Sequence, residues 1–310
     1  MPVTISCILP TANRGQILCD TIGMLLDQFP PVHEIIVVDQ SKIVAPEIVE
    51  QMTRWADTGK ITWMQQESPN ASEARNRGAV VATGEVLLFL DDDIRIDSNF
   101  VANHARNYSD PACNAVAGQL LEGNGETTDT LPSPHAHPSI DWMKFPKNYD
   151  KRAITAWMIS ANVSVRRDVF FAVGGMDESY RKGAVREETD FAMRLRNHGY
   201  SFVFDPHASA YHLQAKGGAR VTNMHIALWK HFFGHWYFIL GHADRHSVIP
   251  LMKDFLRSFV LNRDTLKRPG LLVLRTLLFI AALPVAAVSR IRHCFFPRLI
   301  DYRQQLQAPK

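Results

Sequence analysis

The first ninety residues alternate between short apolar runs and longer segments whose apolar residues recur every three or four positions. Short apolar runs are typical of buried strands, and the spacing of Leu18, Ile22 and Leu25 places them on one helix face. The pattern predicts strands at 4–9, 34–39, 61–65 and 86–90, with helices at 15–28, 47–57 and 71–83 between them. Strands separated by helices form right-handed crossovers, so we predict an α/β fold with a doubly wound, mostly parallel sheet.

The middle of the chain carries weaker signals. We predict a helix at 98–108, a strand at 114–121, a loop at 122–152, regular structure at 157–165, helices at 167–173 and 187–198, and strands at 201–204 and 208–212. A loop this long in a compact domain is usually a lid, a binding loop or locally disordered. Its His135 and His137 are candidate metal ligands, although exposed loop histidines are the simpler interpretation.

Beyond residue 221 the pattern changes to helices rich in aromatic and basic residues, so we predict one domain over 1–220 and a helical extension over 221–310. Residues 271–288 are almost all apolar but include Arg275 and Pro284. Eighteen residues barely span a bilayer, so a helix or hairpin lying in one leaflet fits better than a true span. Packing on the first domain or on a second subunit remains an equal alternative.

Composition and charge indicate which partners the chain is expected to have. The chain is 46% apolar and 21% charged, as in ordinary proteins with a sizeable core. Residues 251–310 hold 11 Lys/Arg against 3 Asp/Glu, a net charge of +8, which leaves 23 against 28 and a net of −5 in residues 1–250. A basic and apolar tail favours a membrane surface over nucleic acid as a partner.

The cysteines and the N-terminus indicate a cytoplasmic protein. The four cysteines have no paired spacing, and we interpret them as reduced thiols: Cys7, Cys19, Cys113 and Cys294. The N-terminus lacks the basic start and long apolar core of a secretory signal.

Three aspartates, Asp91, Asp92 and Asp93, directly follow the apolar run 86–90. Like charges this close repel one another, so the cluster favours a divalent cation that prefers oxygen ligands. An acidic turn that caps the next helix is the alternative. The carboxyl end of a buried parallel strand is also where open α/β sheets place their ligands.

Other polar segments fall at the same predicted edge of the sheet. Strand 1 ends in Pro10-Thr11-Ala12-Asn13-Arg14, strand 2 in Asp39-Gln40-Ser41, and the helix before strand 4 carries Asn70, Arg75, Asn76 and Arg77. A carboxylate for a base or ribose, guanidinium groups for phosphates and a metal cluster together suit a nucleoside diphosphate.

This ordered series resembles the family 2 inverting glycosyltransferases of the GT-A fold, over roughly the first 220 residues. The similarity continues through Ser160-Ala161-Asn162, Gly174-Gly175-Met176-Asp177-Glu178, Glu187-Glu188-Thr189-Asp190 with Arg194, and His212 with Gly217-Gly218. The resemblance implies a GT-A sheet and a nucleotide-sugar donor used with Mn²⁺ or Mg²⁺. The chain departs from the family pattern at two positions: Gln40 stands where an acidic or amide residue is common, and Met176 stands where Phe is usual.

The resemblance also implies residue roles. Metal binding is assigned to Asp91, Asp93 and His212, although His212 as a lone histidine fits a surface or core position as well. Nucleotide-sugar binding is assigned to Pro10, Asn13, Arg14, Asp39, Asn70, Arg75, Asn76 and Asp92. The acceptor or sugar region is assigned to Trp157, Asn162, Glu187 and Asp190. Trp157 is equally well explained as a buried core residue.

Glu188 is the predicted catalytic base. It stands where the family has an aspartate, at the start of the helix 187–198, and should share an inward face with Phe191 and Leu195. The helix N-terminus favours its ionised form. Asp190 is the weaker candidate because it can pair with Arg194 four residues later.

The sequence thus predicts a metal-dependent inverting glycosyltransferase that acts on a cell-surface or lipid-linked glycan, at the cytoplasmic face of a membrane. The absence of an activated Ser or Cys constellation agrees with a single displacement. A haloacid-dehalogenase-like phosphatase is one alternative, but Ile94 and Arg95 follow the acidic cluster where that class needs Thr or Val. A non-catalytic, membrane-docked nucleotide-sugar-binding protein is another. The chain lacks the glycine-rich motifs of sugar-nucleotide pyrophosphorylases and of dinucleotide-dependent oxidoreductases, which argues against both of these enzyme classes.

Overall fold

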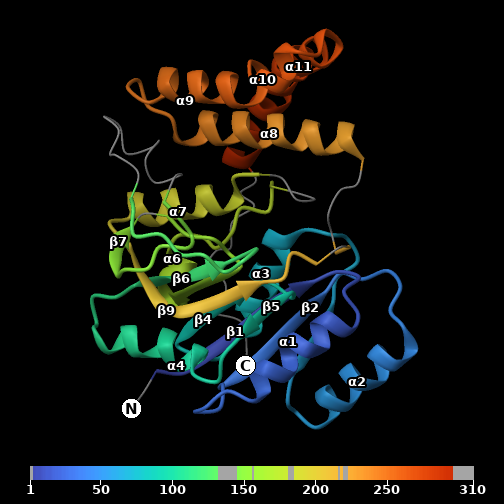
Figure 1. The fold of residues 1–310 in the computed structure, drawn as a ribbon, viewed down its shortest axis with the longest axis vertical. Helices are drawn as coiled ribbons and strands as arrows, with labels where there is room; N and C mark the ends of the chain where they lie inside the picture. The colour runs from blue at the N-terminus through green and yellow to red at the C-terminus, as the bar shows by residue number, and fades with distance from the viewer. Residues whose placement is uncertain are drawn as a thin grey trace.

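The computed structural model of the chain describes residues 3–131, 145–155, 157–180, 185–215, 217–218 and 223–295. Within them, residues 5–212 build one nine-stranded sheet covered by helices. The helices from residue 224 onward form a layer of their own at the top of Figure 1. His135 and His137 lie outside the described residues.

The N-terminal half of the sheet is parallel, as predicted. It contains β1 (Ile5–Thr11), β2 (Glu34–Asp39), β3 (Thr62–Gln65) and β4 (Val86–Leu90) in the order β3-β2-β1-β4. The connecting helices are α1 (Gln16–Leu26), α2 (Pro46–Asp57) and α3 (Ala71–Val81). Because β1 pairs with both β2 and β4, the carboxyl ends of these three strands lie at one edge.

Helix α3 lies unusually close to β1. A Cβ atom on Gly78 would be 2.5 Å from Cγ2 of Ile8, so this position admits no side chain without a shift. Arg75 precedes Gly78 by about one turn on the same helix face. The close approach therefore carries the Arg75 side chain to the carboxyl edge of the sheet.

The second half of the sheet is mixed. Strand β8 (Asn162–Arg166) pairs antiparallel with β4, followed in order by β6 (Ala115–Leu121), β9 (Phe202–His212) and β5 (Ile94–Ile96). A short strand, β7 (Ala153–Thr155), pairs separately with β9. The pairing of Ile94 with His212 matters most, since it brings the segment after β4 beside the end of β9.

Several boundaries differ from the sequence prediction. Strand β9 is continuous where we predicted two strands. It includes Asp205-Pro206-His207, where its register against β6 shifts between Gly118 and Gln119. Strand β8 starts at Asn162, and the described residues of 157–161 are irregular. A helix, α4 (Phe100–Ala105), with a 3₁₀ turn (Arg106–Ser109) replaces the single helix at 98–108, and β5 was not predicted. Helices α6 (Arg167–Ala172) and α7 (Glu187–Asn197) occur where predicted.

Alternate residues of β1 enter two different cores. Cys7 and Leu9 face the core under α1 and α2, whereas Ile8 faces the core shared with α3, α7 and the C-terminal helices. Cys7, Cys19, Cys113 and Cys294 are free cysteines, consistent with the prediction of reduced thiols.

The C-terminal helices are α8 (Met224–His242), α9 (Val248–Phe255), a π-helical turn (Leu256–Val260), α10 (Arg263–Leu266) and α11 (Pro269–Phe295). Their inner faces join the main core, where Phe232, Tyr237, Ala282 and Ala286 are buried in one cluster with Phe191 of α7. Among the described residues, α11 is the one helix long and apolar enough to cross a membrane.

A buried ionic junction also connects this layer to α7. Asp190 of α7 lies 2.7 Å from Nε2 of His242 and 3.4 Å from Nη2 of Arg290. The predicted pair of Asp190 with Arg194 is confirmed at 2.9 Å. Although burial alone would raise it, Arg194 and His242 hold the pKa of Asp190 below its ordinary value.

Candidate active site

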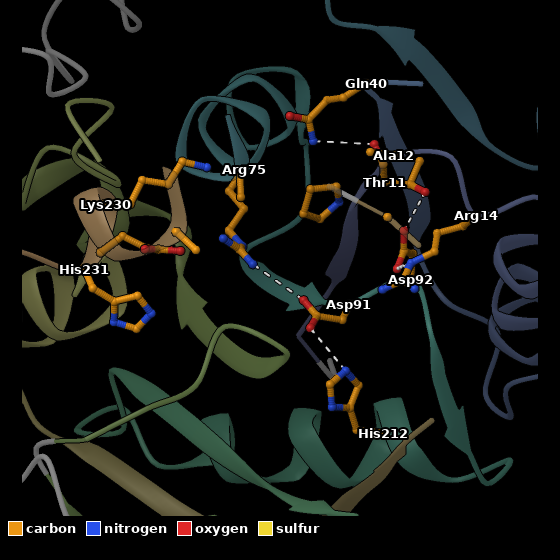
Figure 2. Close-up of a pocket in the computed structure, with 15 residues that line it drawn as sticks. Thr11, Ala12, Arg14, Gln40, Arg75, Asp91, Asp92, His212, Lys230 and His231 are labelled. Carbon is orange, nitrogen blue, oxygen red and sulfur yellow. Dashed lines mark hydrogen bonds and ion pairs between the residues drawn. The ribbon is translucent and has the colours of Figure 1, made fainter. Parts of the chain in front are cut away.

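Polar side chains at the carboxyl edge of β1, β2 and β4 surround a cavity of about 510 Å³. Figure 2 shows Thr11, Arg14 and Asp92 on one side of it and Lys230 and His231 of α8 on the other. The cavity is lined by Pro10, Thr11, Ala12, Arg14, Gln40, Ala71, Arg75, Asp91, Asp92, Glu187, His212, Gly218, Ala227, Lys230 and His231. Of the predicted site residues, seven therefore line one cavity: Pro10, Arg14, Arg75, Asp91, Asp92, Glu187 and His212.

Asp91, Asp93 and His212 form a candidate metal site. One ligand atom from each lies within 4.8 Å of the others. Nε2 of His212 is 3.1 Å from Oδ1 of Asp93 and 3.7 Å from Oδ2 of Asp91. Two carboxylates and an imidazole are a donor set that Mn²⁺ accepts, and Mg²⁺ also accepts the carboxylates. The residues present therefore fit a divalent cation.

Glu122 orients the candidate histidine ligand. Its Oε1 lies 3.0 Å from Nδ1 of His212, and its second oxygen forms an ion pair with Lys147. A carboxylate on Nδ1 favours the tautomer whose Nε2 presents a lone pair to a cation. In the cation-free chain, Asp93 and Glu122 raise the pKa of His212 to about 9, with burial opposing them. Cation binding at Nε2 would therefore compete with protonation of this ring.

Arg14 and Thr11 hold the other aspartates. Nε of Arg14 is 2.9 Å from Oδ1 of Asp92, and its Nη2 is 3.0 Å from Oδ2 of Asp93. The Thr11 hydroxyl donates to Oδ2 of Asp92 at 2.6 Å. Burial raises the pKa of Asp92 to about 6, against the opposing effects of Arg14 and Thr11. Arg14 thus forms ion pairs with two of the three aspartates and offsets part of their negative charge.

Arg75 brings unused donors into the cavity. It is 4% exposed, and its Nη2 lies 3.6 Å from Oδ1 of Asp91, so that Asp91 stands between Arg75 and His212 (Figure 2). Its Nε and Nη1 are buried without a hydrogen-bond partner among the described residues. A buried donor without a partner is costly, so this guanidinium suits an anionic or hydroxyl-rich ligand.

The two adjacent glutamates of α7 differ in placement. Glu187 lines the cavity, where burial and then the neighbouring Glu188 carboxylate raise its pKa against the influence of Arg75. Glu188 does not line this cavity. Its Oε1 accepts hydrogen bonds from N of Ser160 at 2.7 Å and Oγ of Ser160 at 2.5 Å. We predicted that Glu188 points into the pocket, but its carboxylate contacts Ser160 instead, and Glu187 is the glutamate that lines the cavity.

Asn13 and Asp39 line a smaller neighbouring cavity of about 240 Å³, which shares Arg14 with the first. Asn13 adopts a left-handed conformation, with φ of 53°, and its backbone N donates to Oγ of Ser41 at 2.7 Å. Asp39 accepts from N of Ser41 at 2.8 Å and from Nε1 of Trp63 at 3.3 Å. Both predicted nucleotide residues therefore lie next to the main cavity.

Two other predicted residues hold the backbone around α3. The side chain of Asn70 caps α3 by accepting from N of Glu73, and the backbone N of Asn70 donates to Oε1 of Gln40 at 2.6 Å. Asn76 exchanges two hydrogen bonds of 2.8 Å with the backbone of Met176 and donates to Oε1 of Glu178. Neither lines either cavity. Their placement therefore corresponds to scaffold contacts.

Asn162, Asp190 and Trp157 also lie away from the cavity. Asn162 is fully buried, with its Nδ2 donating to the carbonyls of Gln119 and Ala208 and its Oδ1 bonded to His104. Asp190 belongs to the ionic junction described above. Trp157 is half-buried and stacks on Phe145, with ring centroids 6.0 Å apart.

Sequence reasoning missed the contributions of α8 and of Glu122. Lys230 and His231 line the cavity from within the segment that we separated as an extension. No motif marks a lysine and a histidine within an aromatic helix as site residues. Glu122, likewise, was placed only at the start of a loop.

An α/β sheet with candidate metal ligands and arginines around one cavity at its carboxyl edge is typical of proteins that bind nucleotides. The chain matches the family description "Glycosyl transferase family 2" over residues 6–172. This match covers more than half of the chain, and the chain belongs to that family.

Relatives and solved structures agree with this membership. The chain is 25% identical over 213 residues to the O-antigen biosynthesis protein RfbC of Myxococcus xanthus, covering 64% of this chain and 16% of that protein. It is 25% identical over 225 residues to the validoxylamine A glucosyltransferase of Streptomyces hygroscopicus subsp. jinggangensis, covering 63% of this chain and 52% of the relative. The matches thus span only part of these relatives.

A similar solved structure is that of GalNAc-T7 with UDP, GalNAc and Mn²⁺. The TM-score is 0.64 at 16% identity, over 94% of this chain and 58% of that chain. This likeness shows the fold, which confirms the predicted GT-A-type sheet.

Proposed function

We propose that this chain is a metal-dependent inverting glycosyltransferase that moves a sugar from a nucleotide-diphosphate donor to an acceptor hydroxyl. One observation carries the proposal: Asp91 and His212, which form the candidate cation site together with the buried Asp93, line one cavity with Arg14 and Arg75. A nucleotide sugar needs a cation and guanidinium groups at its diphosphate, and both lie within this cavity. Relatives whose names describe glucosyl transfer and O-antigen biosynthesis support the same reading.

The donor would lie along the edge of the sheet. Asn13 and Asp39, in the adjoining smaller cavity, suit the base and ribose, whereas Arg14 and Asp92 lie toward the ribose and diphosphate. Asp91, Asp93 and His212 would hold a divalent ion, which would supply positive charge at the leaving diphosphate. Arg75 and Glu187 then face the sugar, since Arg75 offers unpaired donors and Glu187 offers carboxylate oxygens.

Glu188 is the proposed base. In a single displacement the acceptor oxygen forms a bond to the anomeric carbon from the face opposite the diphosphate, while the bond to the diphosphate breaks. The base takes the hydroxyl proton, and no enzyme nucleophile is required. Ser160 holds Glu188 by two hydrogen bonds, which fixes the carboxylate, and the adjacent residue Glu187 lines the cavity. Glu187 is the competing candidate because it lines the cavity itself.

The acceptor and the location follow from the C-terminal helices. Their basic and apolar composition supports a cell-surface or lipid-linked glycan as acceptor, and a location at the cytoplasmic face of a membrane. Nucleic acid is not a proposed partner.

The test is donor binding followed by turnover. Thermal stabilisation by UDP-, GDP- and dTDP-sugars should appear with Mn²⁺ and vanish with EDTA. Glu188→Gln should abolish transfer and keep donor binding, whereas Glu187→Gln should weaken donor binding as well. If Glu188→Gln keeps wild-type turnover and Glu187→Gln loses it, the base is Glu187. Hydrolysis of simple phosphate esters without sugar transfer would contradict the whole proposal.

A further inference from the structure

Helix α11 carries an uncovered apolar face. Its most hydrophobic 18-residue window has a mean hydropathy of 2.4, yet only 11% of that window is buried. The six most exposed of its large apolar residues lie at spacings of three, four or eight positions and therefore share one side of the helix, with Leu283 and Val285 exposed at its borders. We call these six residues the outer face of α11: Val273 (60% exposed), Leu277 (59%), Ile280 (63%), Val288 (50%), Ile291 (58%) and Phe295 (75%).

The opposite side of α11 is fixed on the protein. Ala282 and Ala286 are fully buried, and Nε1 of Trp236 in α8 donates to the carbonyl of Phe279 at 2.8 Å. At the far end, Nε of Arg290 donates to the carbonyl of Tyr237 at 2.7 Å, and its guanidinium lies 3.7 Å from the centre of the Tyr237 ring. The outer face is therefore held in one orientation, away from α8.

Both arginines of the helix interior turn away from this face. Nη1 of Arg275 donates to the carbonyl of Phe259 at 3.0 Å and to Oγ1 of Thr265 at 2.7 Å. Arg290 reaches Asp177 and Asp190 in the buried junction. A charge in hydrocarbon is costly, and here the chain keeps each interior charge on the protein side. The outer face from Val273 to Val288 consequently presents no ionised group.

Basic side chains flank the two ends of the outer face. Arg263, Lys267 and Arg268 are exposed just before α11, and Arg292 is exposed near its end. An apolar helix face with cations at its borders fits the boundary between acyl chains and anionic headgroups.

The same features disfavour two other occupants. A second copy paired through this face would bring the two sets of flanking cations together, with Asp264 the one exposed acid beside them in the described segment 263–295. A transmembrane span would have to pull Arg290 away from Asp177 and Asp190 and expose the α8 side of the helix to lipid. Figure 1 shows α8 to α11 at one end of the molecule, beyond α7, where a flat surface can reach them.

We infer that the outer face of α11 docks on a bilayer containing anionic lipids, with the helix in the plane of one leaflet. The inference rests on the proposed location of the enzyme and specifies its partner and mode of contact. Apolar residues would enter the acyl boundary while the flanking cations contact headgroup phosphates.

The experiment is flotation of the full chain with phosphatidylcholine vesicles, with and without 30% phosphatidylglycerol, a composition chosen on the order of that in anionic biological membranes. We expect binding to the anionic vesicles that falls at least about tenfold in Leu277→Glu/Ile280→Glu. Ile154→Glu, on the 70% exposed residue of β7, is the matched control and should bind like wild type. Lys267→Gln/Arg268→Gln should weaken binding to anionic vesicles and leave binding to neutral vesicles unchanged.

Three outcomes would overturn the inference. These are unchanged binding of Leu277→Glu/Ile280→Glu, retention of the wild-type chain in membranes after alkaline carbonate washing, and a stable dimer in solution that Ile280→Glu dissociates. Metal-linked stabilisation by a nucleotide sugar is measured in the same samples without vesicles. A variant that no longer binds vesicles but keeps this stabilisation would show that membrane docking and donor binding depend on different residues.

Discussion

The Oγ atom of Ser160 lies 2.5 Å from Oε1 of Glu188, and the backbone N of the same serine donates to that oxygen at 2.7 Å. One buried residue, 2% exposed, therefore directs two donors at one carboxylate oxygen. Hydrogen bonds to a charged acceptor are among the stronger ones in proteins, so Ser160 restricts the position of the Glu188 carboxylate.

Replacing Ser160 by Ala should lower kcat and leave the KM for the donor nearly unchanged. The hydroxyl is lost while the backbone donor remains, and one hydrogen bond to a charged group contributes about 1.5 kcal/mol or more, or roughly tenfold in rate. Steady-state kinetics with saturating donor measure the effect, and Ser160→Thr should restore most of it. In a Glu188→Asp background, where turnover is reduced but measurable, Ser160→Ala should cost less than in wild type, and an additive loss there would show that the serine acts elsewhere.

Asp93→Asn should abolish the effect of Mn²⁺ on donor binding. The substitution removes a ligand charge from the cluster that Asp93 forms with Asp91 and His212. Isothermal titration with a nucleotide sugar, with and without the ion, should show a loss of metal-linked affinity of at least about tenfold. Asp97→Asn, on an exposed residue four positions later, is the control. Equal metal dependence in the two variants would remove Asp93 from the metal site.

Arg290→Met should destabilise the chain strongly. Arg290 lies 3.7 Å from Asp177 and 3.4 Å from Asp190, and both carboxylates are 1% exposed. Removing one partner of a buried pair leaves uncompensated charge, at a cost of about 3 kcal/mol or more. Urea unfolding measures the change, and Arg292→Met, on the exposed neighbour, should shift stability by less than about 0.5 kcal/mol. Similar values for the two variants would show that the junction contributes little.

The sequence predicted those parts of the site that directly follow a clearly apolar strand. The strands before Arg14, Asp39 and Asp91 are apolar runs with clear ends, and parallel strands bring such ends to one edge. Pro10, Arg14, Arg75, Asp91, Asp92, Glu187 and His212 accordingly share the cavity.

What the sequence could not predict depends on long-range pairing. The family resemblance implied that His212 joins Asp93 in the metal site, but the apolar pattern did not, because the two meet through pairing of the unpredicted β5 with β9, more than one hundred residues apart in the chain. Asn162 is enclosed because Gly118 lacks a side chain, since a Cβ there would lie 2.3 Å from Nδ2 of Asn162. Lys230 reaches the cavity through packing of α8 on the main core. Motif spacing alone contains none of these three contacts.

His104 should make stability depend on pH between about 4 and 6.5. Burial lowers its pKa from 6.5 to about 4, against the hydrogen bond with Asn162. In that window the unfolded chain binds a proton that the folded chain does not, so the free energy of unfolding falls as the pH falls, by up to about 1.4 kcal/mol per pH unit. Urea unfolding of wild type and His104→Gln at pH 5, 6 and 7 should therefore give a shallower slope for the variant. His225→Gln, on an exposed histidine, should keep the wild-type slope, and parallel slopes for all three proteins would contradict the assignment.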